Sequence, residues 1–203
     1  MSGLRERKKQ KTRQAILEAA ETLFLEKGFG PVKMGVIAQQ AEVGVGTLYN
    51  YFPSKSSLLL GMMERVTNEI LTRGAVILAQ PVNDPVTTIQ NLLGAYLGFL
   101  ESFQRDLLRE LFATALAEPP EVMQQYAALD MQTVAMVAEL LNNLKTAGFI
   151  RDDLDIEDAA MNLFGVLASL IMLYISDPRM TTTALEEALR RQVGLLFRGM
   201  HPP

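Results

Sequence analysis

Apolar positions repeat at helical spacing along almost the whole chain, and no sustained alternation of apolar and polar residues marks a strand. The first stripe predicts a helix over about residues 7–27, and Gly28 is well placed to cap it in the left-handed conformation. Further stripes predict helices over about 33–41 and 45–51, and a longer one from a Ser54 cap to about 78. We therefore expect an all-α fold of about nine helices.

Prolines and capping residues divide the rest of the chain. Asp155 is expected to cap a helix that runs to about 176, with Asp158 favourable in its first turn. Thr183 and Glu186 predict a capping box that opens the last helix, about 183–198. The other boundaries fall at Pro81, Asp84-Pro85, Pro119-Pro120, Gly148 and Asp177-Pro178.

The segment from Lys33 to Lys55 carries most of the functional information. It is short, punctuated by glycine and rich in aromatic residues, and it predicts two helices joined by a tight turn. Such a unit offers its second helix to the major groove of DNA, so that helix needs one face for its own core and one for DNA. Ala41, Val43, Leu48 and Phe52 suit the inner face, whereas Val45, Gly46, Tyr49 and Asn50 share the outer face with Thr47 at its edge.

The side chains of this segment divide by chemistry. Thr47, Tyr49, Tyr51 and Lys55 are hydrogen-bond donors suited to phosphate oxygens. Asn50 can pair with adenine and Val45 can meet a thymine methyl, but no Arg or Lys lies on the outer face to bind guanine. We expect modest direct readout, with some specificity from DNA shape. The candidate DNA-binding residues are Lys33, Val45, Gly46, Thr47, Tyr49, Asn50, Tyr51 and Lys55.

The net charge of −4 hides an asymmetry. Residues 1–60 hold nine Lys/Arg and five Asp/Glu, a net of +4, whereas the remainder holds ten and eighteen, a net of −8. The basic part is suited to a polyanion. The first thirteen residues are a solvated terminus, or an arm that tracks the DNA backbone or enters the minor groove.

Several function classes are disfavoured. The chain has no Cys and a single His, His201, so we expect no Cys/His metal site, no thiol chemistry, no Ser-His-Asp triad and no cofactor. Adjacent acids such as Asp152 and Asp153 fall in an expected loop, and no catalytic constellation indicates an enzyme. An all-helical ligand carrier or small enzyme remains the alternative, as does a DNA-binding protein without a ligand.

Residues 159–176 carry no charge. A span needs about 20 mainly apolar residues, and this run contains Asn162, Gly165 and Ser169, so we favour a buried helix of a soluble protein. A helix that is apolar all round must contact more than one partner, which suggests a dimer interface. The N-terminus lacks the apolar core of a signal peptide, and we expect a cytoplasmic protein without membrane contact.

The larger part of the chain is rich in Met and aromatic residues, which suit a pocket for a hydrophobic effector. The candidate ligand-binding residues are Met63, Phe99, Phe103, Tyr126 and Met131.

TRQAILEAAETLFLEKGF, followed by VIAQQAEVGVGTLYNYFPSKSSLL, resembles the DNA-binding region of the TetR/AcrR family of transcriptional regulators over about residues 12–60. The resemblance implies a homeodomain-like three-helix DNA-binding domain, 1–53, and a helical ligand-binding and dimerisation domain, 54–203. It also implies a repressor that binds a palindromic operator in double-stranded DNA. The repressor would be a homodimer formed by the last two helices, and a small hydrophobic effector would release it from DNA.

The chain departs from this family's pattern in the motif itself. Glu42 stands where the turn usually has Gly, and a left-handed Glu costs on the order of 1 kcal/mol. Gly44 stands where Ser or Thr normally caps the recognition helix, and Lys33 replaces a frequent Thr cap. Gly35 removes a side chain that some members direct at DNA.

Overall fold

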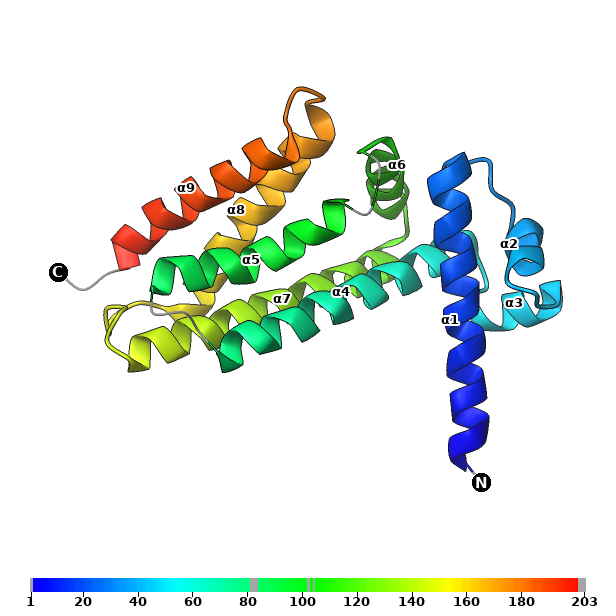
Figure 1. Ribbon diagram of the computed structural model, residues 1–203, viewed down its shortest axis with the longest axis horizontal. Helices are drawn as coiled ribbons and strands as arrows, with labels where there is room; N and C mark the ends of the chain where they lie inside the picture. The colour runs from blue at the N-terminus through cyan, green and yellow to red at the C-terminus, as the bar shows by residue number, and fades with distance from the viewer. Residues whose placement is uncertain (1, 81–83, 102, 104, 201–203) are drawn as a thin grey trace. The chain divides into compact units, whose positions relative to one another are not determined.

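The computed structural model describes residues 2–80, 84–101, 103 and 105–200 and is helical over most of that range (Figure 1). No strand occurs in the described ranges, which confirms the all-α prediction. The nine helices found there are α1 (Ser2–Lys27), α2 (Met34–Gln40), α3 (Val45–Tyr51), α4 (Lys55–Ala79), α5 (Pro85–Glu101), α6 (Arg105–Leu116), α7 (Pro120–Thr146), α8 (Ile156–Ser176) and α9 (Thr182–Met200).

The chain divides into two compact units. The first comprises Met1–Arg65 and Phe103–Tyr126, and the second comprises Val66–Ser102 and Ala127–Pro203. The first unit thus includes α6, which lies far along the sequence from α1–α3. The division that we expected, 1–53 and 54–203, is one of function and stays a prediction.

The first unit is built around α1. Ile16, Leu17 and Ala20 of α1 are fully buried with Ile37 of α2 and Leu48 of α3. Each such aliphatic side chain removed from water contributes about 1.5–3 kcal/mol, except for the smaller alanine. These contacts hold two seven-residue helices that are too short to be stable alone.

The ends of the first helices follow their sequence signals closely. Gly28 adopts φ +79° and its N–H donates to the Phe24 carbonyl, so it caps α1 as predicted. The Ser57 N–H donates to Ser54 Oγ, and the Ser54 N–H donates to Ser57 Oγ, both at 3.0 Å. Ser54 therefore caps α4 as predicted. The start of α1 was misplaced, because the helix begins at Ser2 rather than near residue 7.

The second unit contains α8 and α9, which pack against each other (Figure 1). Asp155 caps α8 as predicted, because its carboxylate accepts the Asp158 N–H at 3.0 Å. The predicted cap of α9 was wrong by two residues. Thr181, not Thr183, accepts the Ala184 N–H, and the helix begins at Thr182. Three successive threonines offer equivalent hydroxyls, so local sequence does not single out one of them.

Helix α8 buries one face and exposes the other. Its length and composition would allow it to cross a membrane, and 44% of its most apolar stretch is buried. Leu163, Leu167 and Leu170 lie on the buried face, whereas Met161 and Met172 are exposed. A helix packed on one side in this way is typical of the core of a soluble protein.

Candidate nucleic-acid interface

Helix α3 has the two faces that a groove-entering helix needs. Leu48 is fully buried and Phe52, just beyond the helix, is 3% exposed, so these two side chains anchor the inner face. On the opposite side, Val45 is 48% and Tyr49 47% exposed. Gly46, Thr47 and Asn50 are also exposed, whereas Tyr51 is half-buried. An exposed valine and tyrosine on so short a helix form an apolar surface with polar groups beside it, which is suited to a DNA groove.

The turn between α2 and α3 positions that face. Glu42 adopts φ +54°, so this non-glycine residue has the left-handed conformation at the position where the TetR/AcrR turn usually has Gly. The Val43 N–H donates to the Ala38 carbonyl at 2.9 Å and closes the turn. Gly44 then caps α3 without a side-chain hydrogen bond, and its carbonyl accepts the Leu48 N–H at 3.0 Å.

Lys33, the other basic candidate in the motif, lies at the N-cap position of α2. It makes no side-chain capping hydrogen bond there, and its side chain is exposed. An exposed ammonium group next to a short helix is free to contact a phosphate, which is consistent with its predicted role.

Lys55 is held differently from the exposed candidates. Its ammonium group donates to the carbonyl oxygens of Phe29 and Gly30, the latter at 3.0 Å, and lies 4.3 Å from the centre of the Phe29 ring. Partial burial lowers the pKa of this ammonium group, and the nearby Glu110 carboxylate opposes that shift. An ammonium group has three N–H bonds, so two are used by the protein itself and one is left for a phosphate.

Glu110 of α6 completes this arrangement and was not predicted to belong to it. Its carboxylate accepts the N–H of Phe29 at 2.9 Å and of Gly30 at 2.5 Å. Lys55 binds the carbonyls of the same two residues. The loop after α1 is therefore held by an acid and a base that lie on different helices. We call Glu110, Lys55, Phe29 and Gly30 the loop clamp.

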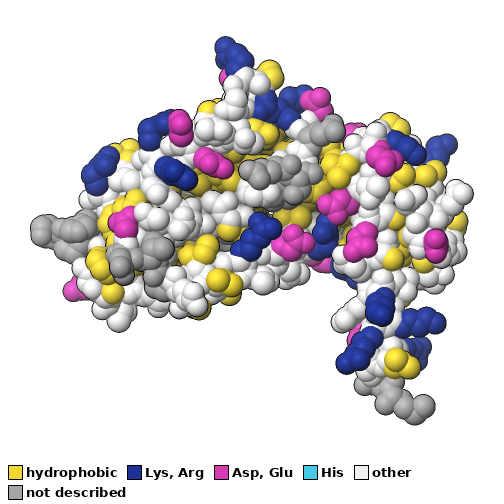
Figure 2. All heavy atoms as spheres, in the orientation of Figure 1, with side chains coloured by type: hydrophobic (Ala, Val, Ile, Leu, Met, Phe, Trp, Pro, Cys, Tyr) yellow, Lys and Arg dark blue, Asp and Glu magenta, His cyan; other side chains and the backbone are white. Residues whose placement is uncertain are grey.

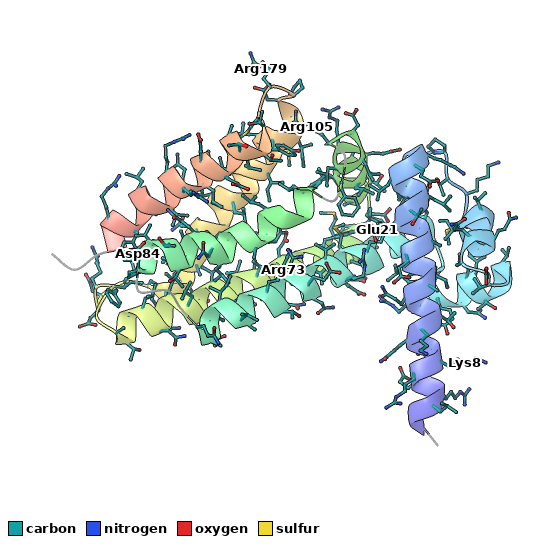
Figure 3. The ribbon with its side chains drawn as sticks, in the orientation of Figure 1. Lys8, Glu21, Arg73, Asp84, Arg105 and Arg179 are labelled. Atoms are coloured by element: carbon teal, nitrogen blue, oxygen red, sulfur yellow. The ribbon has the colours of Figure 1, made fainter. Side chains whose placement is uncertain are left out.

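Two ion pairs fix α4 to α1. Arg13 reaches Glu64 at 2.5 Å and stacks over the Phe52 ring at 5.4 Å, and Arg65 pairs with Glu21 (labelled in Figure 3). Arg13 belonged to the basic N-terminal run of the sequence, but its guanidinium group is committed to the fold. Within this basic run, the cations available to a partner are therefore those that precede Arg13.

The ligand-binding candidates are divided between the two units. Met63, Phe103 and Tyr126 belong to the first unit, Met131 belongs to the second, and the Phe99 side chain lies outside the described residues. Phe103 is buried, Met63 is half-buried and Met131 is 43% exposed. Their roles stay predictions.

One of these candidates, Tyr126, has an unusual environment. Its hydroxyl is buried and has no hydrogen-bond partner among the described residues. Burial, with a smaller contribution from the negative charge of Glu118, raises the pKa of this phenol to about 12. The hydroxyl therefore stays protonated at neutral pH and keeps its capacity to donate a hydrogen bond.

The second unit contains a polar pair that sequence patterns did not reveal. The Tyr96 hydroxyl donates to Asp130 at 3.3 Å, and the Tyr96 ring meets Phe164 edge-on at 6.1 Å. Burial raises the pKa of the Asp130 carboxyl, although the Tyr96 hydrogen bond opposes that shift. His201, the one histidine, lies outside the described residues.

Comparisons with known proteins agree on one family. The family described as "Bacterial regulatory proteins, tetR family" matches residues 16–62, from within α1 to within α4. The transcriptional repressor KstR of Rhodococcus jostii is 36% identical over 104 residues, which cover 51% of this chain and 46% of that protein. The transcriptional regulator UidR of Escherichia coli is 26% identical over 79% of this chain and 82% of its own length. The chain thus spans about half the length of the first of these relatives.

Solved structures resemble the chain over nearly its whole length. FadR of Thermus thermophilus, a transcriptional repressor of this family solved in complex with lauroyl-CoA, has a TM-score of 0.74 and 26% identity over 94% of this chain and 96% of its own. A regulator from Mesorhizobium loti shares the fold, with a TM-score of 0.72 and 20% identity over 94% of this chain and 97% of its own. The family match falls on the helix-turn-helix that the geometry singles out. Residues 16–62 of this chain therefore match the DNA-binding region of the TetR family of bacterial transcriptional regulators, and the chain shares the fold of solved members of that family over nearly its whole length.

Proposed function

We propose that this chain is a ligand-responsive transcriptional repressor. It binds a palindromic operator in double-stranded DNA as a homodimer, and a small hydrophobic effector releases it. In this proposal residues 1–53 bind DNA, and residues 54–203 bind the effector and form the dimer. The protein acts in the cytoplasm, where its operator is, and performs no catalysis.

The observation that carries the proposal is the exposed face of α3. Val45, Tyr49 and Asn50 project from a helix whose opposite side is locked by Leu48. Val45 and Tyr49 are spaced at i and i+4 on this short helix, and each exposes nearly half of its surface, so a partner can contact both together with Asn50. Asn50 is the residue we assign to base reading, through a pair of hydrogen bonds to adenine.

The homodimer is supported by the free side of α8. Met161, Gly165, Ala168 and Met172 recur at helical spacing and are all exposed, and the helix has no charge from Ala159 to Ser176. On the neighbouring α9, Leu195 is 56% exposed. The uncharged apolar face of α8, extended by Leu195 of α9, is suited to a second copy of itself across a two-fold axis.

Leu170 of α8 is unsuitable as a position for testing this dimer. It is only 8% exposed within its own unit, so a charge there would damage the core rather than the interface. Met172 replaces it as the test position.

The effector is proposed to be hydrophobic because the chain is rich in Met and apolar residues. The Thermus thermophilus repressor, 26% identical to this chain, was solved with lauroyl-CoA, which makes acyl-CoA thioesters the first probes to test. The shared helical architecture over 94% of the chain supports a comparable division of labour.

The test is selection of bound duplexes from a random DNA pool, followed by binding measurements at two salt concentrations. The expected result is an enriched palindrome with half-sites separated by about 34–36 Å or a multiple of that distance. Asn50→Ala should then cost roughly 1–3 kcal/mol on the selected site and little on other duplexes. Binding without any enriched sequence would contradict the proposed repressor function.

A further inference from the structure

The N-terminal third of α1 extends beyond the core that the rest of the helix serves. Residues 3–11 are all exposed, and the first fully buried residue of the helix is Ile16. Arg5 precedes Ile16 by eleven residues, which at the helical rise corresponds to about 16 Å. Lys8 is labelled on this projecting part in Figure 3, and Figure 2 shows Lys and Arg side chains gathered around it. We call residues 3–12 the N-terminal arm.

The arm is strongly basic, and its cations have no acidic partner in the part of the chain that the structure describes. It carries Arg5, Arg7, Lys8, Lys9 and Lys11 against the single acid Glu6. No ion pair joins any of these cations to another of the residues described in the structure. Arg13, one turn further on, shows the contrast, because it pairs with Glu64.

This charge is unfavourable for the helix that carries it. Arg5 lies in the first turn of α1, where a cation opposes the macrodipole at a typical cost of about 0.3–1 kcal/mol at low ionic strength. Further along, the like charges Arg5 with Lys9 and Arg7 with Lys11 are spaced at i and i+4, and each pair typically costs about 0.2–0.5 kcal/mol. The first turn of α1 contains no acid that would offset them. The cations therefore do not stabilise the helix, and a bound polyanion would relieve their mutual repulsion.

Helical spacing sorts the cations into two faces. Arg5, Lys8 and Lys9 form a stripe that continues through Thr12 into the buried positions Ile16 and Ala19. Their side chains therefore lie on the same side of α1 as the buried residues by which α1 packs in the first unit, where it contacts α2. Arg7 and Lys11, at i and i+4, lie on the other side.

The helical state of the arm decides how it can meet DNA. A helix with side chains is about 10–12 Å across, whereas the minor groove is only about 6 Å wide. The helical arm is therefore too wide to enter the minor groove without unfolding. It can instead follow the phosphate backbone, which is the other binding mode that the sequence allows. Its reach of about 16 Å corresponds to about half a turn, or 5 base pairs, of duplex.

We propose that the N-terminal arm is a second DNA-binding element, in which Arg5, Lys8 and Lys9 bind backbone phosphates of the duplex that flanks each half-site. The inference rests on the proposed DNA-binding function and deepens it. It assigns sequence-independent affinity to the arm, whereas α3 supplies the reading of bases.

The experiment compares two double variants of the full-length protein that remove the same charge. Lys8→Ala/Lys9→Ala removes cations from the proposed stripe, and Arg7→Ala/Lys11→Ala removes them from the other face. Alanine preserves the helix, which circular dichroism verifies. Affinity for a long duplex is measured between 50 and 200 mM salt by fluorescence anisotropy.

The homodimer carries two arms, so the stripe variant loses two phosphate contacts in each protomer. The slope of log K against log salt should therefore fall by about 3.6, because each lost contact removes about 0.9. Over this fourfold salt range, the affinity of the stripe variant should fall about 150-fold less than that of the unsubstituted protein. The matched variant should change the slope by less than about 0.5. Equal changes in both variants, or an unchanged slope in the stripe variant, would overturn the inference.

The same measurement separates this inference from the proposed repressor function. Phosphate contacts do not depend on sequence, so the slopes can be measured on any duplex even if no operator is selected. A selected operator with unchanged slopes overturns only the arm. When the selected duplex is trimmed by about 5 base pairs at each end, the slope for the unsubstituted protein should fall at least as far as that of the stripe variant, because Arg5 loses its phosphate as well.

Discussion

The loop clamp makes a quantitative prediction for Glu110→Ala. The substitution removes a carboxylate that accepts two backbone N–H groups, from Phe29 at 2.9 Å and Gly30 at 2.5 Å. A net hydrogen bond to a charged group is worth about 1.5–3 kcal/mol where it is well buried. The Phe29 bond is part-buried and the Gly30 bond is exposed. We therefore expect a combined loss of about 2 kcal/mol in the free energy of unfolding, which is below the roughly 3–6 kcal/mol of two well-buried bonds of this kind.

The assay is urea unfolding followed by circular dichroism at 222 nm, since the chain has no tryptophan to report by fluorescence. Asp106→Ala is the matched control on the same helix, because Asp106 pairs with Arg109 at an exposed site. Such a pair contributes at most about 1 kcal/mol and often nothing measurable. Glu110→Gln should fall between the two, because its amide oxygen can still accept one of the N–H groups.

The clamp also predicts a functional effect. Lys55 binds the carbonyls of the same loop residues, so loss of Glu110 should loosen the start of α4, which follows α3 directly. Glu110→Ala should weaken DNA binding while leaving the salt slope unchanged. Glu110 is negatively charged and does not itself contact a phosphate, so its loss does not change the number of phosphate contacts. If Glu110→Ala unfolds with the same free energy as Asp106→Ala, the clamp does not hold the loop and this reasoning is wrong.

Three further substitutions test other parts of the structure. Glu42→Gly should stabilise the protein by about 0.5–1 kcal/mol, because relief of a left-handed non-glycine residue, about 1–2 kcal/mol, exceeds the added chain entropy; a lower urea midpoint than that of the unsubstituted protein would contradict it. Asp130→Asn should stabilise the protein at pH 7, because burial raises the folded-state pKa of the Asp130 carboxyl and its ionisation therefore opposes folding. The gain should vanish near pH 4, where the carboxyl is neutral in the folded protein; a gain that persists in acid in the same unfolding assay would reject this cause. Met172→Arg should yield monomers in analytical ultracentrifugation, whereas Val76→Arg, at a 62% exposed position of α4, should leave the dimer intact; a dimeric Met172→Arg protein would place the interface elsewhere.

Sequence reasoning succeeded where the signal was local. The bounds of α3 and the caps at Gly28, Ser54 and Asp155 each depend on residues within one helical turn. The left-handed Glu42 was anticipated because a turn of that shape needs a particular backbone angle whatever side chain it carries.

The features that the sequence did not reveal depend on contacts between distant residues. Glu110 binds backbone groups about 80 positions earlier in the chain, and no periodicity or motif marks such a contact. Tyr96 and Asp130 are 34 residues apart on different helices. The burial of Leu170 could not be predicted either, because a helix that is apolar all round offers no polar side by which to orient it.

The continuity of α1 has one more consequence. A flexible tail would tolerate added or lost residues, but here the direction of Lys8 and Lys9 is set by the same helix that buries Ile16 and Leu23. One residue inserted after Thr12 would rotate everything before it by about 100° and carry these lysines round toward another side of the helix. An insertion of seven residues, close to two full turns, would restore their direction while lengthening the reach by about 10 Å. The number of residues in this stretch therefore sets the direction in which the arm's lysines point as well as its reach.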